Sequence, residues 1–107
     1  MAKYLVIGSY TAAGAAGLLK EGGTARLAAG KAAVASVGGT LETLYWGFGS
    51  DDFYALVDVP DHAAATAASL KLSSSGAFSS LRSVPLMTAE DLDAAAKLSP
   101  AFRAPGA

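Results

Sequence analysis

The 107-residue sequence contains no cysteine, a single histidine and four prolines. Without cysteine the chain cannot form disulfides, thiolate metal sites or a cysteine nucleophile. Within a single chain, one histidine, His62, cannot supply the two or three imidazoles that histidine-based metal sites use, although a symmetric partner could supply a second copy. The sequence therefore indicates neither a metal site nor a cofactor.

Charge and long apolar runs are also scarce. Eight Lys and Arg stand against nine Asp and Glu, for a net charge of −1 at pH 7, and no basic stripe suited to phosphates is present. No apolar run approaches the ~20 residues that cross a bilayer, and the first residues lack the apolar stretch of a secretory signal. We expect a soluble, cytoplasmic protein that binds neither nucleic acid nor membrane.

Apolar residues are plentiful, at 52% of the chain, but 25 of them are alanine. Few large apolar side chains are therefore left to fill the core. A domain of this size also buries only a modest fraction of its surface when it folds. This shortage favours additional burial by self-association.

Strand-like and helical segments alternate along the chain. Strands are predicted at residues 3–10, 40–48, 53–59 and 77–86, which are rich in β-branched and aromatic residues. Helices are predicted to start after Thr11, Thr24, Asp61 and Thr88, whose side chains can cap a first turn, and the last helix is predicted to end near Leu98. Gly30 lies on the apolar stripe of its helix, which suggests close approach to a sheet.

The order of these elements predicts the fold class. It is α+β: a ferredoxin-like βαββαβ unit with a C-terminal helix, in which helices cover one face of a four-stranded antiparallel sheet. Residues 1–99 form the predicted domain, and the Pro- and Ala-rich residues 100–107 form a flexible tail.

Both faces of the predicted sheet are apolar. In the second strand, for example, Leu44 and Trp46 alternate with Leu41 and Tyr45. A face exposed to water would instead alternate apolar with charged residues. We therefore predict a homodimer that packs through the open sheet face, with a higher oligomer left open.

Several motifs resemble the bacterial GYD-domain family over residues 3–98. They are YLVIGSYT at 4–11, LLKEGG at 18–23, Gly14, Arg26, Gly38, Gly39 and the turn that begins Phe48-Gly49. The namesake pattern is a Gly, a Tyr and an Asp in the hairpin turn, and this chain keeps Gly49 and Asp52 but has Asp51 at the Tyr position. The resemblance implies a dimeric α+β barrel. It does not imply an activity, because related folds include monooxygenases, isomerases and haem enzymes.

Four residues are candidates for ligand binding. Tyr10 and Tyr45 could stack on an aromatic molecule, and Arg26 could hold a carboxylate or phosphate with its planar fork. Asp52 could anchor a ligand or could accept backbone N–H groups within its turn.

Three functions follow from these candidates. The leading hypothesis is a homodimer that binds a small apolar or aromatic molecule between sheet and helices. The first alternative is a cofactor-free isomerase or monooxygenase-like enzyme, with Tyr10, Tyr45, Asp52 or His62 in acid–base roles. The second alternative is a purely structural oligomer.

Overall fold

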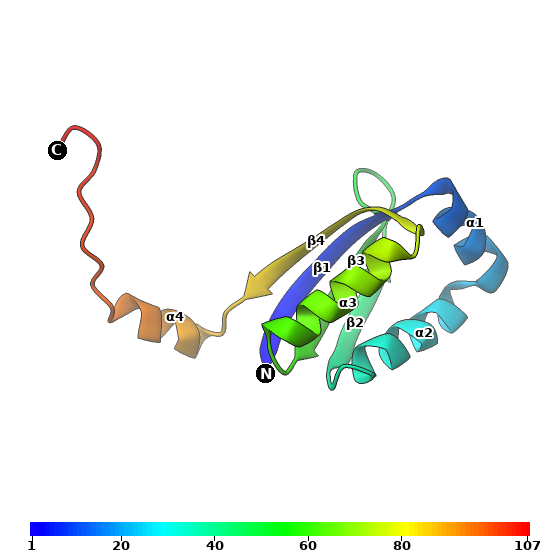
Figure 1. The fold of residues 1–107 in the computed structure, drawn as a ribbon, viewed down its shortest axis with the longest axis horizontal. Coiled ribbons are helices and arrows are strands. Elements are labelled where there is room, and N and C mark those ends of the chain that lie inside the picture. The colour runs from blue at the N-terminus through cyan, green and yellow to red at the C-terminus, as the bar shows by residue number, and fades with distance from the viewer.

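The computed structural model describes residues 1–107 and contains four strands and four helices (Figure 1). The strands form one antiparallel sheet in the order β2-β3-β1-β4. This architecture confirms the predicted α+β fold and is consistent with a ferredoxin-like arrangement. The elements are β1 (Ala2–Tyr10), α1 (Ala12–Glu21), α2 (Gly23–Ala35), β2 (Thr40–Trp46), β3 (Phe53–Val59), α3 (His62–Ser74), β4 (Phe78–Leu86) and α4 (Ala89–Ala96).

The first helical region is divided at Gly22. Thr11 caps α1 as predicted, since its hydroxyl accepts from the Gly14 N–H at 3.1 Å. The prediction that Thr24 caps the next helix is wrong, because α2 already begins at Gly23 and has no side-chain cap. Gly22 has a φ of 88°, which a glycine adopts without steric cost, so the chain leaves one helix and enters the next at once.

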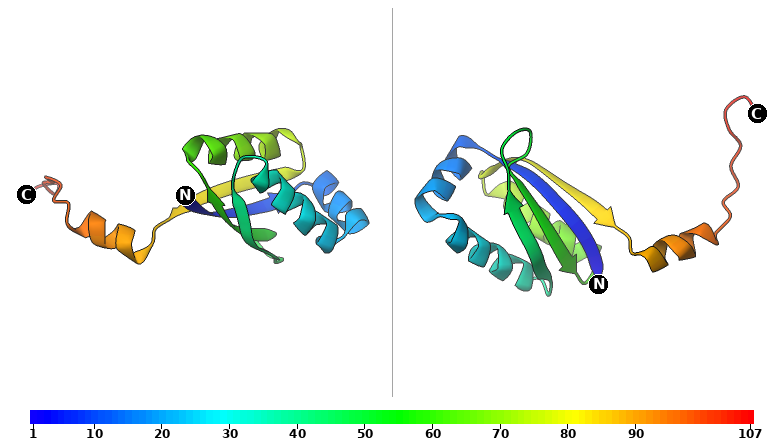
Figure 2. Two further views of the ribbon diagram at one scale, coloured as in Figure 1. Left: turned by 90° about the horizontal axis from the view of Figure 1, so that it is seen from below. Right: turned by 180° about the vertical axis from the view of Figure 1, so that it is seen from behind.

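The core lies between the sheet and the two helices α2 and α3. The alternate β3 residues Phe53, Ala55, Val57 and Val59 are all buried, as expected for the covered face of a strand. Leu27 and Val34 of α2 and Ala64 and Ala65 of α3 pack against this cluster. The opposite face of the sheet has no helix over it (Figure 2).

A β-bulge resets the alternation of side chains in β2. The register shifts between Leu41 and Thr43, so Glu42 is the extra residue. As a result Leu41 joins the core beside the helices, and the prediction that it shares the face of Tyr45 is wrong. Glu42 turns to the open side, where its carboxylate bonds the Lys3 ammonium at 2.7 Å.

Close packing explains the glycine inside α2. A Cβ atom at Gly30 would lie 3.2 Å from Cδ2 of Leu41 on the sheet. The expected close approach of this helix to the sheet is therefore confirmed.

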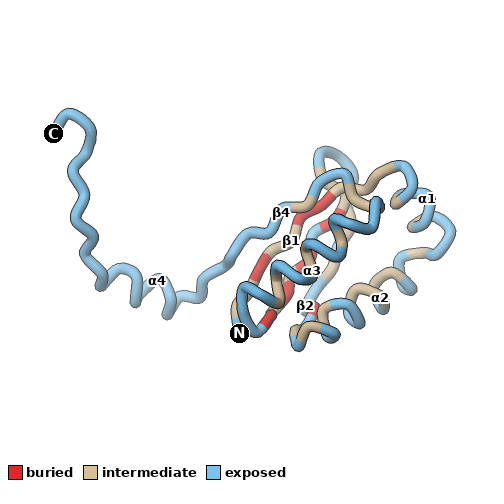
Figure 3. Tube along the Cα trace, in the orientation of Figure 1, coloured by how far each residue is buried: buried red, intermediate tan, exposed pale blue.

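The chain beyond β4 leaves the sheet. The C-terminal arm (residues 87–107) includes α4, points away from the remaining elements and is exposed at every residue (Figures 1 and 3). Thr88 and Asp91 form the predicted capping box, but the helix ends at Ala96 rather than near Leu98. None of the helices has the length and apolar character required to cross a membrane.

Candidate functional site

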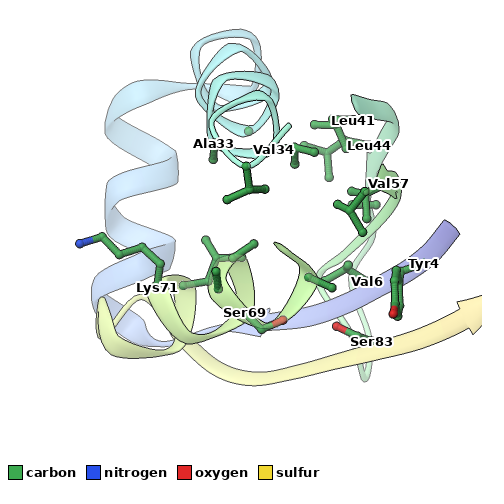
Figure 4. A pocket seen from close by; sticks show the side chains of 18 of the residues that line it. Tyr4, Val6, Ala33, Val34, Leu41, Leu44, Val57, Ser69, Lys71 and Ser83 are labelled. Atoms are coloured by element: carbon green, nitrogen blue, oxygen red, sulfur yellow. The ribbon is translucent and has the colours of Figure 1, made fainter. Parts of the chain in front are cut away.

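A cavity of about 390 Å³ lies between the sheet and helices α2 and α3 (Figure 4). Its volume is within the usual range for small-molecule sites. Seventeen of its 23 lining residues are hydrophobic, and none is Asp or Glu. The space exists because the helices present small residues, among them Ala33, Ala65 and Ala68, whose methyl groups do not reach across to the sheet.

One end of the cavity is aromatic. The Tyr10 ring lies 5.6 Å from Phe53 and 5.4 Å from Phe78, measured between ring centroids. The Tyr10 hydroxyl accepts a hydrogen bond from Nε1 of Trp46 at 3.1 Å. This end therefore offers ring faces to a ligand, while its one hydroxyl is already engaged.

The other end of the cavity is polar. Tyr4, Ser69 and Ser83 line it, and they also line an adjoining recess of about 230 Å³ together with His62. The Tyr4 hydroxyl and Nδ1 of His62 form a hydrogen bond. Sequence reasoning missed Ser69 and Ser83. Tyr4 was not among the four predicted ligand-binding residues, although alternation along β1 places its side chain on the same face as that of Tyr10.

Two of the four predicted ligand-binding residues line the cavity, namely Tyr10 and Arg26. The Arg26 side chain is 34% exposed, and its guanidinium is 3.9 Å from the Glu21 carboxylate. At this distance the ion pair is loose, and it leaves most of the donors of Arg26 without a partner.

The other two candidates lie elsewhere. Tyr45 is 69% exposed and pairs with Tyr54 in the sheet. The Asp52 carboxylate accepts from the Tyr10 N–H at 2.8 Å, which ties the hairpin turn to the end of β1. Asp51, beside Asp52 in the turn, pairs with Arg82 at 3.0 Å.

The main charge cluster is on the side of the sheet away from the cavity. There the pKa of Lys3 is raised, chiefly by its hydrogen bond to Glu42 and further by the negative charge of Asp58, against an opposing desolvation effect. No three His, Asp or Glu side chains gather in the geometry of a metal site. This charge cluster therefore lies on the open side of the sheet, whereas the mostly apolar cavity lies on the side covered by the helices.

Comparison with known proteins identifies the family of this chain. The model of the GYD domain matches residues 4–96, a segment that spans the sheet, the helices over it and α4. No match was found among curated proteins or among solved structures. Because the matched segment covers most of the sequence, the chain belongs to the GYD domain family.

Proposed function

We propose that this protein binds a small apolar or aromatic molecule in the cavity between the sheet and helices α2 and α3. The observation that carries the proposal is the apolar lining of a 390 Å³ space. Water in such a space gains few hydrogen bonds from the walls. An apolar ligand that displaces this water gains about 25 cal/mol for each Å² of apolar surface removed from solvent.

The lining disfavours catalysis by a carboxylate general base. No carboxylate faces the cavity, and Asp52 is used by the Tyr10 backbone. Tyr45 lies outside the cavity, on the opposite face. A general base must come within hydrogen-bond reach of the proton that it removes, and neither Asp52 nor Tyr45 meets that condition for a ligand held here.

A cavity-filling substitution tests the proposal. Ala68→Phe places a ring in the cavity from α3, whereas Ala63→Phe places the same ring on an exposed position of the same helix that does not line the cavity. We expect calorimetric titration with naphthalene to show binding to the wild type and to Ala63→Phe. Binding to Ala68→Phe should be lost. If neither the wild type nor the control binds naphthalene, or if all three bind it equally, the cavity is not the site.

We also propose that the open sheet face pairs with the same face of a second copy. The strand register places the apolar residues Leu5, Ile7, Tyr45, Tyr54, Leu56, Val84 and Leu86 on the open face, and of these Ile7 is only 8% exposed. Its middle is apolar, with Lys3, Glu42 and Asp58 clustered at one end and Arg82, opposite Ile7 on β1, paired with Asp51 toward the other. A stable interface buries roughly 800 Å² on each partner, and the exposed apolar residues of the C-terminal arm extend the surface available for it.

A charge placed on the open face tests this pairing. Leu56→Asp puts a carboxylate in the middle of the proposed interface, whereas Leu19→Asp puts one on α1, where the leucine is 89% exposed. Light scattering coupled to size-exclusion chromatography should show a dimer for the wild type and Leu19→Asp, and a folded monomer for Leu56→Asp. A wild-type protein that is monomeric at micromolar concentration refutes the pairing.

A further inference from the structure

We propose that the Tyr4 end of the cavity binds an uncharged hydroxyl group of the ligand. This inference rests on the proposed function and narrows its ligand class to an apolar or aromatic molecule that carries one hydroxyl, as a phenol does. It follows from the polar groups gathered at this end and from the charges that are missing there.

The first of these groups is the Tyr4 hydroxyl, held at the wall of the core. Tyr4 is only 7% exposed, and its ring meets that of His62 edge-on, at 77° and 6.2 Å between centroids. The hydroxyl is hydrogen-bonded to Nδ1 of His62. When the neutral imidazole accepts at Nδ1, the phenolic oxygen of Tyr4 keeps free lone pairs that can accept a hydrogen bond from a ligand.

The second group is a pair of serine hydroxyls. Ser69 comes from α3 and Ser83 from β4, and both line the cavity and the recess beside it. Figure 4 shows their side chains at the same end as Tyr4. Ser74 in α3 and Ser36, directly after α2, each donate to the backbone carbonyl three residues earlier. Ser69 and Ser83 form no such bond and are free to donate to a ligand.

The absence of charged side chains from the recess determines which ligand head groups the Tyr4 end can bind. The recess at this end contains no Lys, Arg, Asp or Glu. Lys71, which lines the cavity from α3, points away from Tyr4 in Figure 4, and Arg26, near the start of α2, faces Glu21 at the end of α1. A carboxylate bound here would lose water without gaining a cation. An uncharged hydroxyl, by contrast, can donate to the Tyr4 oxygen and accept from a serine.

A series of naphthalene derivatives tests the inference by calorimetry. Naphthalene, 2-naphthol and 2-naphthoate share one ring system and differ in the head group. We expect 2-naphthol to bind about fivefold more tightly than naphthalene, as one net hydrogen bond provides. 2-Naphthoate should bind about tenfold more weakly than 2-naphthol, or worse, because its charge is desolvated.

Two variants assign this preference to the Tyr4 end. Tyr4→Phe and Ser83→Ala should each weaken 2-naphthol binding severalfold and leave naphthalene binding unchanged. Tyr54→Phe, which removes a hydroxyl from the open face, is the matched control and should alter neither.

The outcomes distinguish failure of the hydroxyl site from failure of the proposed cavity function. If naphthalene binds but 2-naphthol binds no more tightly, or if both cavity variants keep the preference for 2-naphthol, the hydroxyl site is refuted while the cavity function stands. Tightest binding of 2-naphthoate also refutes it. If none of the three probes binds, the proposed function fails together with the inference.

Discussion

Two glycines in helix α1 should respond in opposite directions to the same substitution. A Cβ atom at Gly14 would lie 2.1 Å from the carbonyl oxygen of Ala77, whereas a Cβ atom at Gly17 would meet no other atom within 4 Å. The Ala77 carbonyl cannot turn aside freely, because it accepts the Thr11 N–H at 2.9 Å. Gly14→Ala therefore forces α1 away from the start of β4.

The magnitudes follow from these two environments. At Gly17 the change to alanine removes conformational freedom from the unfolded chain and should stabilise the protein by about 0.5–1 kcal/mol. At Gly14 the same gain is opposed by overpacking, which costs about 1–3 kcal/mol. The hydrogen bond from Thr11 is also weakened as the helix moves. The free energies of unfolding of the two variants should therefore differ by roughly 1–3 kcal/mol, with Gly17→Ala the more stable.

Urea unfolding measures this difference. Trp46, the single tryptophan, lies on β2, so its fluorescence reports loss of the sheet. All measurements need one protein concentration, because self-association would shift the apparent stability. If Gly14→Ala is as stable as Gly17→Ala, the close approach of α1 to Ala77 does not constrain the fold.

Two further predictions concern polar contacts outside the cavity. Asp52→Ala leaves the Tyr10 N–H without its acceptor and should lower the free energy of unfolding by about 1–3 kcal/mol in urea titrations; unchanged stability would contradict the bond between turn and strand. Because the pKa of Lys3 is raised above 10.5, its ion pairs stabilise the fold below that pH, and this contribution is lost as the pH rises through the raised value. In Glu42→Gln, NMR titration of the Lys3 ammonium should give a lower midpoint than in the wild type, and superimposable curves would rule out the assigned cause.

Local signals in the sequence were sufficient to predict most of the helices and strands. Thr11, Asp61 and Thr88 each cap a helix as predicted, because an N-cap acts on N–H groups only two or three residues away. The strands of the sheet also followed from local composition. The start of α2 was not predictable in this way. Gly22 serves as its cap through a backbone conformation that glycine can adopt, but the presence of a glycine does not by itself predict that conformation.

The face assigned to Leu41 shows where periodicity fails. Strict alternation placed it with Tyr45, but one extra residue at Glu42 moved it into the core. The bulge depends on how β2 pairs with β3, and pairing partners are distant in sequence. A pattern read along one strand therefore has no information about it.

The sequence by itself determined the order of the elements, the antiparallel α+β fold and the apolar character of both sheet faces, because these depend on short-range propensity and on alternation. It also placed Tyr10 and Arg26 among the candidates. Only the tertiary structure decided that these two residues share a cavity, that Tyr45 lies on the far side of the sheet, and that Tyr4 meets His62 across 58 positions of chain. These contacts depend on strand register and on the distance between helix and sheet. Both are set only when segments that are distant in sequence pack together.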